Sequence, residues 1–281
     1  MAQPGWSVPA SDLPATGLTP SATWVLRRRR SRGYRTPQRP PDGGPAGPDR
    51  SGREAVAAAP ATIGRVQPPR SLPVAIGGLA VPQDDVSTAT WRYVQRWLPS
   101  YLLAHSVRSY CWGASIGAGE RRTFDRQVLW TASLLHDLGL TRIPRNGDCF
   151  EVAGGAFARR FLEGAGLPAS RAAVVDRAIV LHMQPGVTID DGVEAVLLDR
   201  ATALDVRGVG FELVADVRPA VMREFPRGAF DRHFLAAISR EAALRPDCQS
   251  ARLLHATGLA GWMERSPWAP RASGRRASGL R

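Results

Sequence analysis

The sequence predicts an all-α protein, in which a single helical domain lies between two disordered basic tails. Apolar residues recur at helical spacing through residues 72–265, and no segment there shows the apolar–polar alternation of a strand. The two ends are instead rich in Pro, Gly, Ala, Ser and Arg, with little periodicity. Such segments bury too little apolar area to offset the entropy of ordering. We therefore expect tails at 1–71 and 266–281 and a domain at 72–265.

Most of the excess positive charge lies in the two ends. The chain of 281 residues has a formal net charge of +12, and its 37 basic side chains are all arginine. Residues 1–71 hold 11 arginines and 4 acids, and residues 266–281 hold 4 arginines and no acid, which leaves the region between them at +1. A nucleic-acid-binding domain carries its basic surface on the folded unit, so no nucleic acid is expected for the domain. Arg27–Arg30 either contacts anionic polymers or lipids, or belongs to a solvated tail or a start assigned too far upstream.

Cysteine usage and hydropathy favour a cytoplasmic protein. Cys111, Cys149 and Cys248 form no CxxC pair and suggest no disulfide framework, so Cys111 and Cys248 are expected to be ordinary buried or half-buried residues. No apolar run approaches the roughly 18–20 residues that cross a bilayer. The apolar stretch at residues 22–26 is too short for a signal peptide and precedes its arginines. No membrane partner is therefore expected, and homo-oligomerisation is left open.

Helix signals follow one another along the domain. Asp84 or Asp85 suits the start of the first helix, and Pro99 suits the start of the second. The segment from Gly113 to Gly119 indicates a break. Asp148 suits an N-cap. The expected helices cover residues 84–97, 100–110, 124–138, 148–161, 169–183, 192–206, 211–223, 230–244 and 251–263.

The segment Val128–Gly139 is the most distinctive part of the domain. It carries no charge until Asp137, and a helix that is apolar on every side is usually buried. Gly139 is a natural stop for it. The helix dipole disfavours a carboxylate at this end by about 0.3–1 kcal/mol, and adjacent helical residues do not face each other. His136 and Asp137 therefore need a cation between them, and a metal ion is the simplest candidate.

Five polar residues lie among apolar neighbours in the predicted helices. They are His105, His136, Asp137, His182 and Asp205. Imidazole nitrogens together with carboxylate oxygens suit zinc, iron or manganese. A bound metal lowers the pKa of a coordinated water to about 7 and so supplies hydroxide at neutral pH. The sequence therefore predicts a metal site that activates water.

The order His … His-Asp … Asp resembles the HD-domain superfamily of metal-dependent hydrolases, and within it the cyanamide hydratase-like branch. The segments that carry this resemblance are Leu103–Tyr110, Leu134–Thr141, Phe150–Gly154, Ala178–His182 and Leu204–Gly208. The resemblance implies a helical HD fold with one divalent metal ion, zinc first, with iron or manganese as alternatives. It implies His105, His136, Asp137 and Asp205 as the metal ligands.

The last ligand is a choice between two aspartates. Periodicity does not separate Asp199 from Asp205, because both have Ala or Thr neighbours at helical spacing. The motif selects Asp205. His182 is interpreted as an extra ligand, a substrate contact or a group that orients the site.

Two further residues are catalytic candidates that also have a structural interpretation. Glu151 is interpreted as a base near the metal, or as the partner of Asp148 in a capping box. Arg108 lies one turn from His105 and either steadies a developing negative charge or pairs with a carboxylate. His233 and His255 fall outside the matching segments and are given no role.

The matching segments depart from the branch in two places. Relatives usually carry Asp and then Gly-Ala after Phe-Glu-Val, whereas this chain has Ala153-Gly-Gly-Ala156. A threonine often follows the histidine at the position of His182, whereas here it is Met183. Neither change affects a predicted ligand, but both reshape the expected pocket. The substrate is therefore less constrained by the resemblance than the metal.

The leading functional hypothesis is a metal-dependent hydrolase or hydratase that acts on a small molecule. The branch resemblance implies hydration of a small nitrile such as cyanamide. A phosphohydrolase acting on a nucleotide or phosphate ester is the closest rival, although phosphates normally need several cationic groups. A third hypothesis is a non-catalytic HD module with tails that contact nucleic acid, and a fourth is an iron oxygenase in which His182 completes a dinuclear site.

Overall fold

The computed structural model describes residues 70–141, 147–256 and 258–269. The tails predicted at 1–71 and 266–281 lie outside these residues, except at their inner ends. The long helices are α1 (Asp85–Trp97), α2 (Ser100–Gly119), α3 (Arg126–Leu135), α4 (Phe150–Gly164), α5 (Ala169–Leu181), α6 (Val193–Arg207) and α8 (Phe230–Leu244). The shorter ones are α7 (Arg218–Glu224), α9 (Gln249–Ala256) and α10 (Leu259–Glu264), with 3₁₀ turns η2 (Leu138–Leu140), η3 (Ile189–Asp191) and η4 (Phe211–Val214). The all-α prediction is confirmed.

A small hairpin precedes the helices in the described part of the chain. Strand β1 (Ala75–Ile76) pairs antiparallel with β2 (Leu79–Ala80). Helix α1 then begins as predicted, because the Asp84 carboxylate accepts a hydrogen bond from the backbone N–H of Ser87 at 2.8 Å. The hairpin is a local exception to the all-helical expectation.

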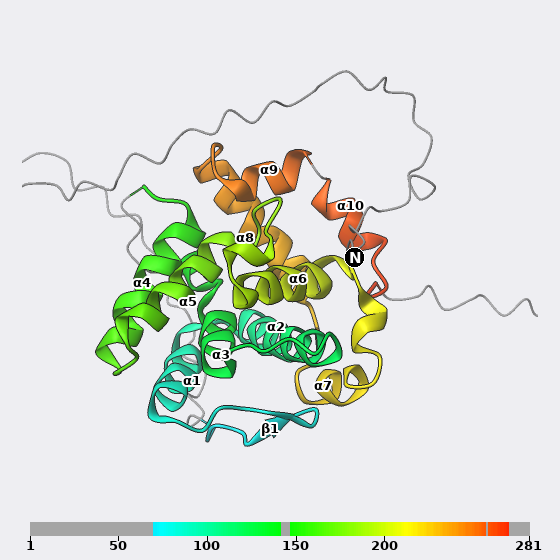
Figure 1. Cartoon of the computed structure of the whole chain (residues 1–281). Coiled ribbons are helices and arrows are strands. Elements are labelled where there is room, and N and C mark those ends of the chain that lie inside the picture. The colour runs from blue at the N-terminus through cyan, green and yellow to red at the C-terminus, as the bar shows by residue number, and fades with distance from the viewer. Residues whose placement is uncertain (1–69, 142–146, 257, 270–281) are drawn as a thin grey trace, which may run out of the picture. The chain divides into compact units, whose positions relative to one another are not determined.

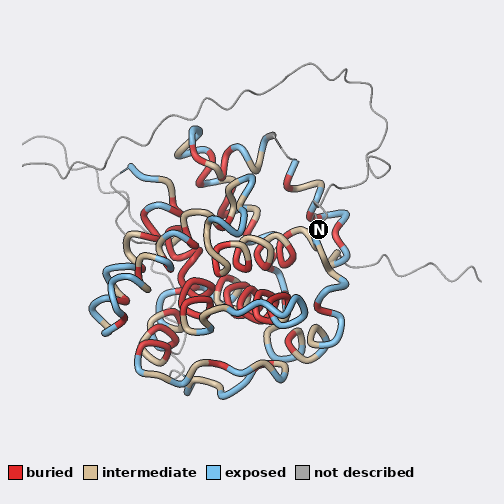
Figure 2. The backbone as a smooth tube through the Cα atoms, viewed as in Figure 1, coloured by how far each residue is buried: buried red, intermediate tan, exposed pale blue. Residues whose placement is uncertain are grey.

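Helix α2 is the centre of the domain and is buried along most of its length (Figure 2). It packs against both α3 and α6 (Figure 1). The break predicted from Gly113 to Gly119 is wrong, because the helix continues to Gly119. A Cβ on Gly117 would lie 2.6 Å from the Phe124 ring. These glycines therefore allow close packing and do not end the helix.

Two predicted helices are divided in the structure. The helix expected over 211–223 is the 3₁₀ turn η4 followed by α7, and the helix expected over 251–263 is α9 followed by α10. In the second case Gly258 adopts φ +64° just before α10, which a continuous helix does not allow. The helix predicted over 230–244 has the bounds of α8.

The folded part extends beyond both predicted boundaries. The Arg70 backbone N–H donates to the Gln95 side-chain oxygen at 2.8 Å. At the other end, Trp268 Nε1 donates to the Leu204 carbonyl at 2.7 Å and its ring stacks on Trp112. Trp268 falls within the predicted basic tail, so the predicted boundary lies too early in the chain. Among the described residues, no helix is both long enough and apolar enough to cross a bilayer.

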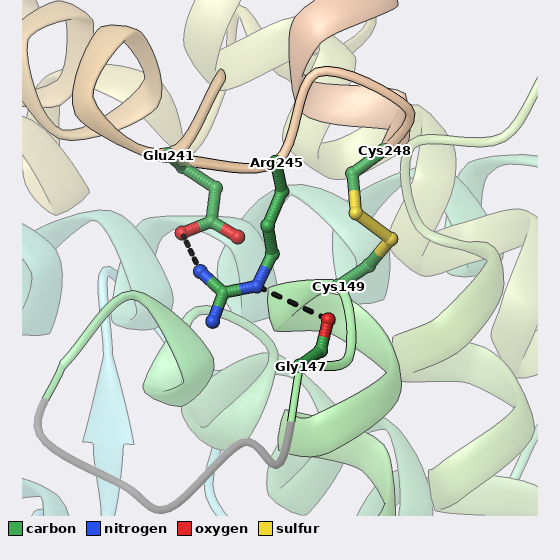
Figure 3. The surroundings of a disulfide bond; sticks show 5 residues. All are labelled: Gly147, Cys149, Glu241, Arg245 and Cys248. Atoms are coloured by element: carbon green, nitrogen blue, oxygen red, sulfur yellow. Dashed lines mark hydrogen bonds and ion pairs between the residues drawn. A yellow bond between two sulfur atoms is a disulfide. The ribbon is translucent and has the colours of Figure 1, made fainter. Parts of the chain in front are cut away.

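A disulfide joins Cys149, just before α4, to Cys248, just before α9 (Figure 3). The expectation of no disulfide is therefore wrong for this pair. Cys111 is a free, buried cysteine as predicted. The two bonded cysteines are 99 residues apart in sequence, so only the tertiary fold brings them together.

Candidate metal centre

Three helices bring four of the predicted site residues together inside the domain. His105 lies within α2, His136 and Asp137 follow α3 directly, and His182 follows α5 directly. All four side chains are at most 5% exposed. The site therefore lies where the C-terminal ends of α3 and α5 meet the side of α2.

The turn that carries His136 and Asp137 is held tightly against α4. Helix α3 ends at Leu135, three residues before the predicted end, and the chain continues into η2. Gly139 lies inside this 3₁₀ turn, so the prediction that it stops the helix is wrong. A Cβ there would lie 1.9 Å from the backbone oxygen of Phe150. Gly139 is thus needed for close approach to the first residue of α4.

Each of the three histidines has its Nδ1 atom held by a hydrogen-bond acceptor. His105 Nδ1 is 2.7 Å from a carboxylate oxygen of Asp205. His136 Nδ1 is 2.8 Å from the Ser133 carbonyl, and His182 Nδ1 is 2.6 Å from the Ile179 carbonyl. Carbonyl and carboxylate oxygens only accept, so each Nδ1 carries the hydrogen. A ring that carries no second proton then presents the lone pair of Nε2.

These lone pairs point toward one another. His105 Nε2 and His136 Nε2 are 3.1 Å apart, and neither can donate to the other while Nδ1 carries the hydrogen. Asp137 Oδ2 is 3.2 Å from His136 Nε2 and 3.5 Å from His105 Nε2, and it has no hydrogen-bond partner among the described residues. Two nitrogen lone pairs and a buried carboxylate at this separation repel unless a cation lies between them, which is either a proton on His136 or a metal ion.

The donor set therefore fits a metal ion. One ligand atom from each of His105, His136 and Asp137 lies within 4.8 Å of the others, and all three residues are buried. A second point supports the fit, since metal-bound histidines usually donate their other ring N–H to a carboxylate or a carbonyl. The coarser prediction, a buried His/Asp group able to hold a metal, is confirmed. The identity of the metal stays a prediction.

His182 stands next to this group. Its Nε2 is 3.9 Å from Asp137 Oδ1, and its ring meets the His136 ring edge to face, with centroids 4.9 Å apart. Burial lowers the pKa of His182 to about 4, and His136 lowers it further when it is protonated. At neutral pH its imidazole is thus an uncharged donor of electrons. The geometry suits a further ligand or a contact to a metal-bound molecule.

The cluster shifts the charge states of its own members. Burial lowers the pKa of His105, although Asp205 opposes the shift. Burial also acts to lower the pKa of His136, but the Asp137 carboxylate outweighs it and the pKa is raised. For Asp137, burial is outweighed by His136 and the other histidines, and its pKa is held below the usual range. Asp137 is therefore an anion in the folded protein.

Asp205 is predicted to be a direct metal ligand, but in the structure its carboxylate contacts His105 Nδ1 and Arg108. One oxygen accepts from His105 Nδ1 at 2.7 Å and from Arg108 Nη2 at 2.7 Å. The other accepts from Arg108 Nε and from Trp112 Nε1, both at 2.8 Å. Burial acts to raise the pKa of Asp205, but the Arg108 guanidinium outweighs it and holds the pKa well below its usual range. Both oxygens are occupied, so Asp205 orients His105 and is outside the ligand group.

Arg108 has the structural role, the second of its two predicted roles. Its side chain is fully buried against Asp205 and the Phe230 ring. It does not line the cavity described below. Arg108 thus fixes the carboxylate that fixes His105.

Glu151 also lies away from the cavity, and the capping box with Asp148 is not formed. The N-cap of α4 is Cys149, with no side-chain hydrogen bond to the helix. Glu151 is 2% exposed and close enough to Glu241 that burial, followed by the charge of Glu241, raises its pKa. Glu241 pairs with Arg245, which also donates to the Gly147 carbonyl beside the disulfide (Figure 3). Glu151 therefore lies outside the cavity, where its charge is influenced by Glu241.

A cavity of about 320 Å³ leads to His105, His136 and Asp137, which are called the metal group below. Its walls are the four site residues together with Phe150, Met183, Gln184, Pro185, Gly186, Asp199, Thr202, Ala203, Val206, Arg207, Phe234, Gln249 and Leu253. The sequence pattern offers Asp199 only as a ligand, and it does not predict Arg207 or Gln249 as cavity residues. The spacing of the α6 residues that line the cavity, at positions 199, 202, 203 and 206, could have been recognised in the sequence as one helical face. No comparable signal marks Gln249.

Comparison with protein-family models and with curated proteins produced no match for this chain.

Proposed function

We propose that the protein is a metal-dependent hydrolase or hydratase of the HD type, acting on a small molecule. The observation that carries the proposal is the convergence of the Nε2 atoms of His105 and His136 on the Asp137 carboxylate, with each Nδ1 anchored. These three residues would hold a divalent ion, zinc first, with His182 beside it. Such an ion supplies a Lewis acid and lowers the pKa of a bound water to about 7.

The walls of the cavity favour a small substrate. Its volume of about 320 Å³ is at the lower end of the range for ligand pockets, which is roughly 300–1,000 Å³. Among the described residues, Arg207 is the one arginine that lines it. Phosphoryl groups are normally held by several cationic groups. We therefore place hydration of a small nitrile such as cyanamide before hydrolysis of a nucleotide.

The protein's own residues have separable tasks in this proposal. Asp205, held by Arg108 and Trp112, keeps the His105 ring in one orientation and one tautomer. The carbonyls of Ser133 and Ile179 do the same for His136 and His182. Phe150 and Phe234 supply apolar wall around the cluster and limit access of water.

The test is an activity panel on the zinc-loaded full chain. Cyanamide, acetonitrile, bis(p-nitrophenyl) phosphate and the common nucleotides are supplied, and release of urea, amide, p-nitrophenol or phosphate is measured. The proposal predicts turnover of a nitrile that is lost in His136→Ala and retained in His255→Ala, whose side chain is exposed. Turnover of phosphate esters alone would shift the proposal to a phosphohydrolase. Zinc-loaded protein that is inactive on the whole panel contradicts it.

A further inference from the structure

Helix α6 presents one face to the cavity. Asp199, Thr202, Ala203 and Val206 all line it, at the spacing that places residues on one side of a helix. Asp205 on the same helix points instead to His105 and Arg108. The helix therefore carries two aspartates with different surroundings, one behind the metal group and one in the cavity.

Thr202 ties the cavity face of α6 to the metal group. Its hydroxyl oxygen is 3.1 Å from the His182 carbonyl and 2.9 Å from the Asp199 carbonyl. The Thr202 hydroxyl thus links the backbone of Asp199 to the turn that holds His182. This places Asp199 in the same wall of the cavity as that turn.

The Asp199 carboxylate is free to act on a bound molecule. Among the described residues its oxygens make no hydrogen bond or ion pair, and the charges of Arg207 and Arg200 lower its pKa only in part. The side chain is half-buried, and burial raises its pKa to about 6 against the pull of these two arginines. A carboxyl group with a pKa near neutrality exchanges protons readily at neutral pH.

The other titratable or charged groups that line the cavity either belong to the candidate metal site or carry a permanent charge. They are His105 on α2, His136 and Asp137 after α3, His182 after α5, and Arg207 on α6. The residues of α8 and α9 that line it, Phe234, Gln249 and Leu253, are uncharged. Asp199 is thus the cavity carboxylate outside the metal group, within the described part of the chain.

We propose that Asp199 is the catalytic residue that takes up and returns the proton during the reaction in this cavity. The inference rests on the proposed function and gives Asp199 the task that the sequence offered to Glu151. An O–H bond of the attacking water breaks, and its electron pair forms the bond to the electrophilic atom of the substrate. The proton goes to a carboxylate oxygen of Asp199. Asp199 then passes it to the substrate atom that gains electron density, and so returns to its ionised form.

The first arm of the test compares Asp199→Asn with Asp176→Asn in the zinc-loaded full chain. Asp176 is a matched control, because it is also a half-buried helical aspartate whose pKa is raised by burial, yet it does not line the cavity. With cyanamide and bis(p-nitrophenyl) phosphate as probes, Asp199→Asn is expected to lower kcat by about 100-fold or more. Zinc content should stay equal to wild type. Asp176→Asn should stay within about twofold of wild type.

The second arm does not depend on activity. Protein labelled with ¹³C at aspartate side chains is titrated with and without zinc, and the Asp199 signal is identified by its absence in Asp199→Asn. The Asp199 carboxyl is expected to titrate above the usual aspartate range without metal, and zinc is expected to lower its pKa, because a nearby cation favours the anion. The Asp176 signal should not respond to zinc.

The outcomes separate this inference from the proposed function. A chain that takes up no zinc refutes both. A zinc-loaded chain whose Asp199→Asn variant keeps the wild-type kcat refutes the inference alone. Where neither probe is turned over, an Asp199 signal that titrates normally and ignores zinc also refutes it. An elevated pKa that falls on addition of zinc supports it.

Discussion

Replacing Asp205 by asparagine tests whether Asp205 is itself a metal ligand or only orients the ligand His105. The new side chain would keep one acceptor oxygen but lose the charge that faces His105 Nδ1 and Arg108. Substitutions of groups that orient metal-bound histidines typically weaken metal affinity about 10–100-fold, which is about 1.4–2.7 kcal/mol. Asp205→Asn should therefore still bind zinc, with a Kd raised by that factor. His136→Ala should lose binding far more completely.

The same substitution has a cost in folding. Asp205 accepts three hydrogen bonds from Arg108 and Trp112, and both donor side chains are fully buried. Removing one partner of a buried ion pair destabilises a protein by about 3–5 kcal/mol. Zinc affinity is therefore measured by chelator competition well below the unfolding temperature, and stability separately by urea unfolding. Asp176→Asn, a half-buried helical aspartate outside the cavity, is the control. Loss of zinc by Asp205→Asn to the same extent as His136→Ala would refute the orienting role and restore Asp205 as a ligand.

Three further predictions concern the surroundings of the site. Gly139→Ala should destabilise the protein by about 1–3 kcal/mol in thermal unfolding, because its Cβ meets an α4 carbonyl, whereas Gly164→Ala, in open space, should not; equal melting temperatures would contradict this. Cys149→Ser or Cys248→Ser should lower the free energy of unfolding by about 4–5 kcal/mol, because the bond closes a 99-residue loop. Wild type treated with a reductant should be destabilised to the same extent. Equal urea unfolding midpoints for the variants and untreated wild type would contradict the disulfide. The pKa of His182 is lowered to about 4, so the unfolded chain binds its proton more tightly, and metal-free protein should lose stability as pH falls from about 6.5 toward 4. This loss of stability should be smaller in His182→Gln. Curves of unfolding free energy against pH that run parallel for the two proteins would contradict this.

The features that depend on local pattern could be predicted from the sequence. Asp84, one of the two residues expected to start α1, is its N-cap, and the bounds of α8 match because Phe230–Leu244 has a clear apolar face between breakers. The pairing of His105 with His136-Asp137 could also be predicted, since buried polar residues on apolar helices need a shared partner.

The rest depends on contacts between distant segments. Nothing near Gly117 reveals that Phe124 and α6 press against it, so the local pattern predicts a break where the structure has a packing glycine. The orientation of Asp205 is set by Arg108 and Trp112, about a hundred residues earlier. Whether Asp199 or Asp205 faces the cavity is a question of helix rotation, which periodicity alone leaves open.

The most direct test is a count of metal equivalents in the purified full chain, in His136→Ala and in His255→Ala. Two facing imidazole lone pairs and a buried carboxylate predict about one divalent ion per chain in wild type and in His255→Ala, and close to none in His136→Ala. Equal metal content in all three proteins, or none in any after zinc is supplied, would contradict the metal centre.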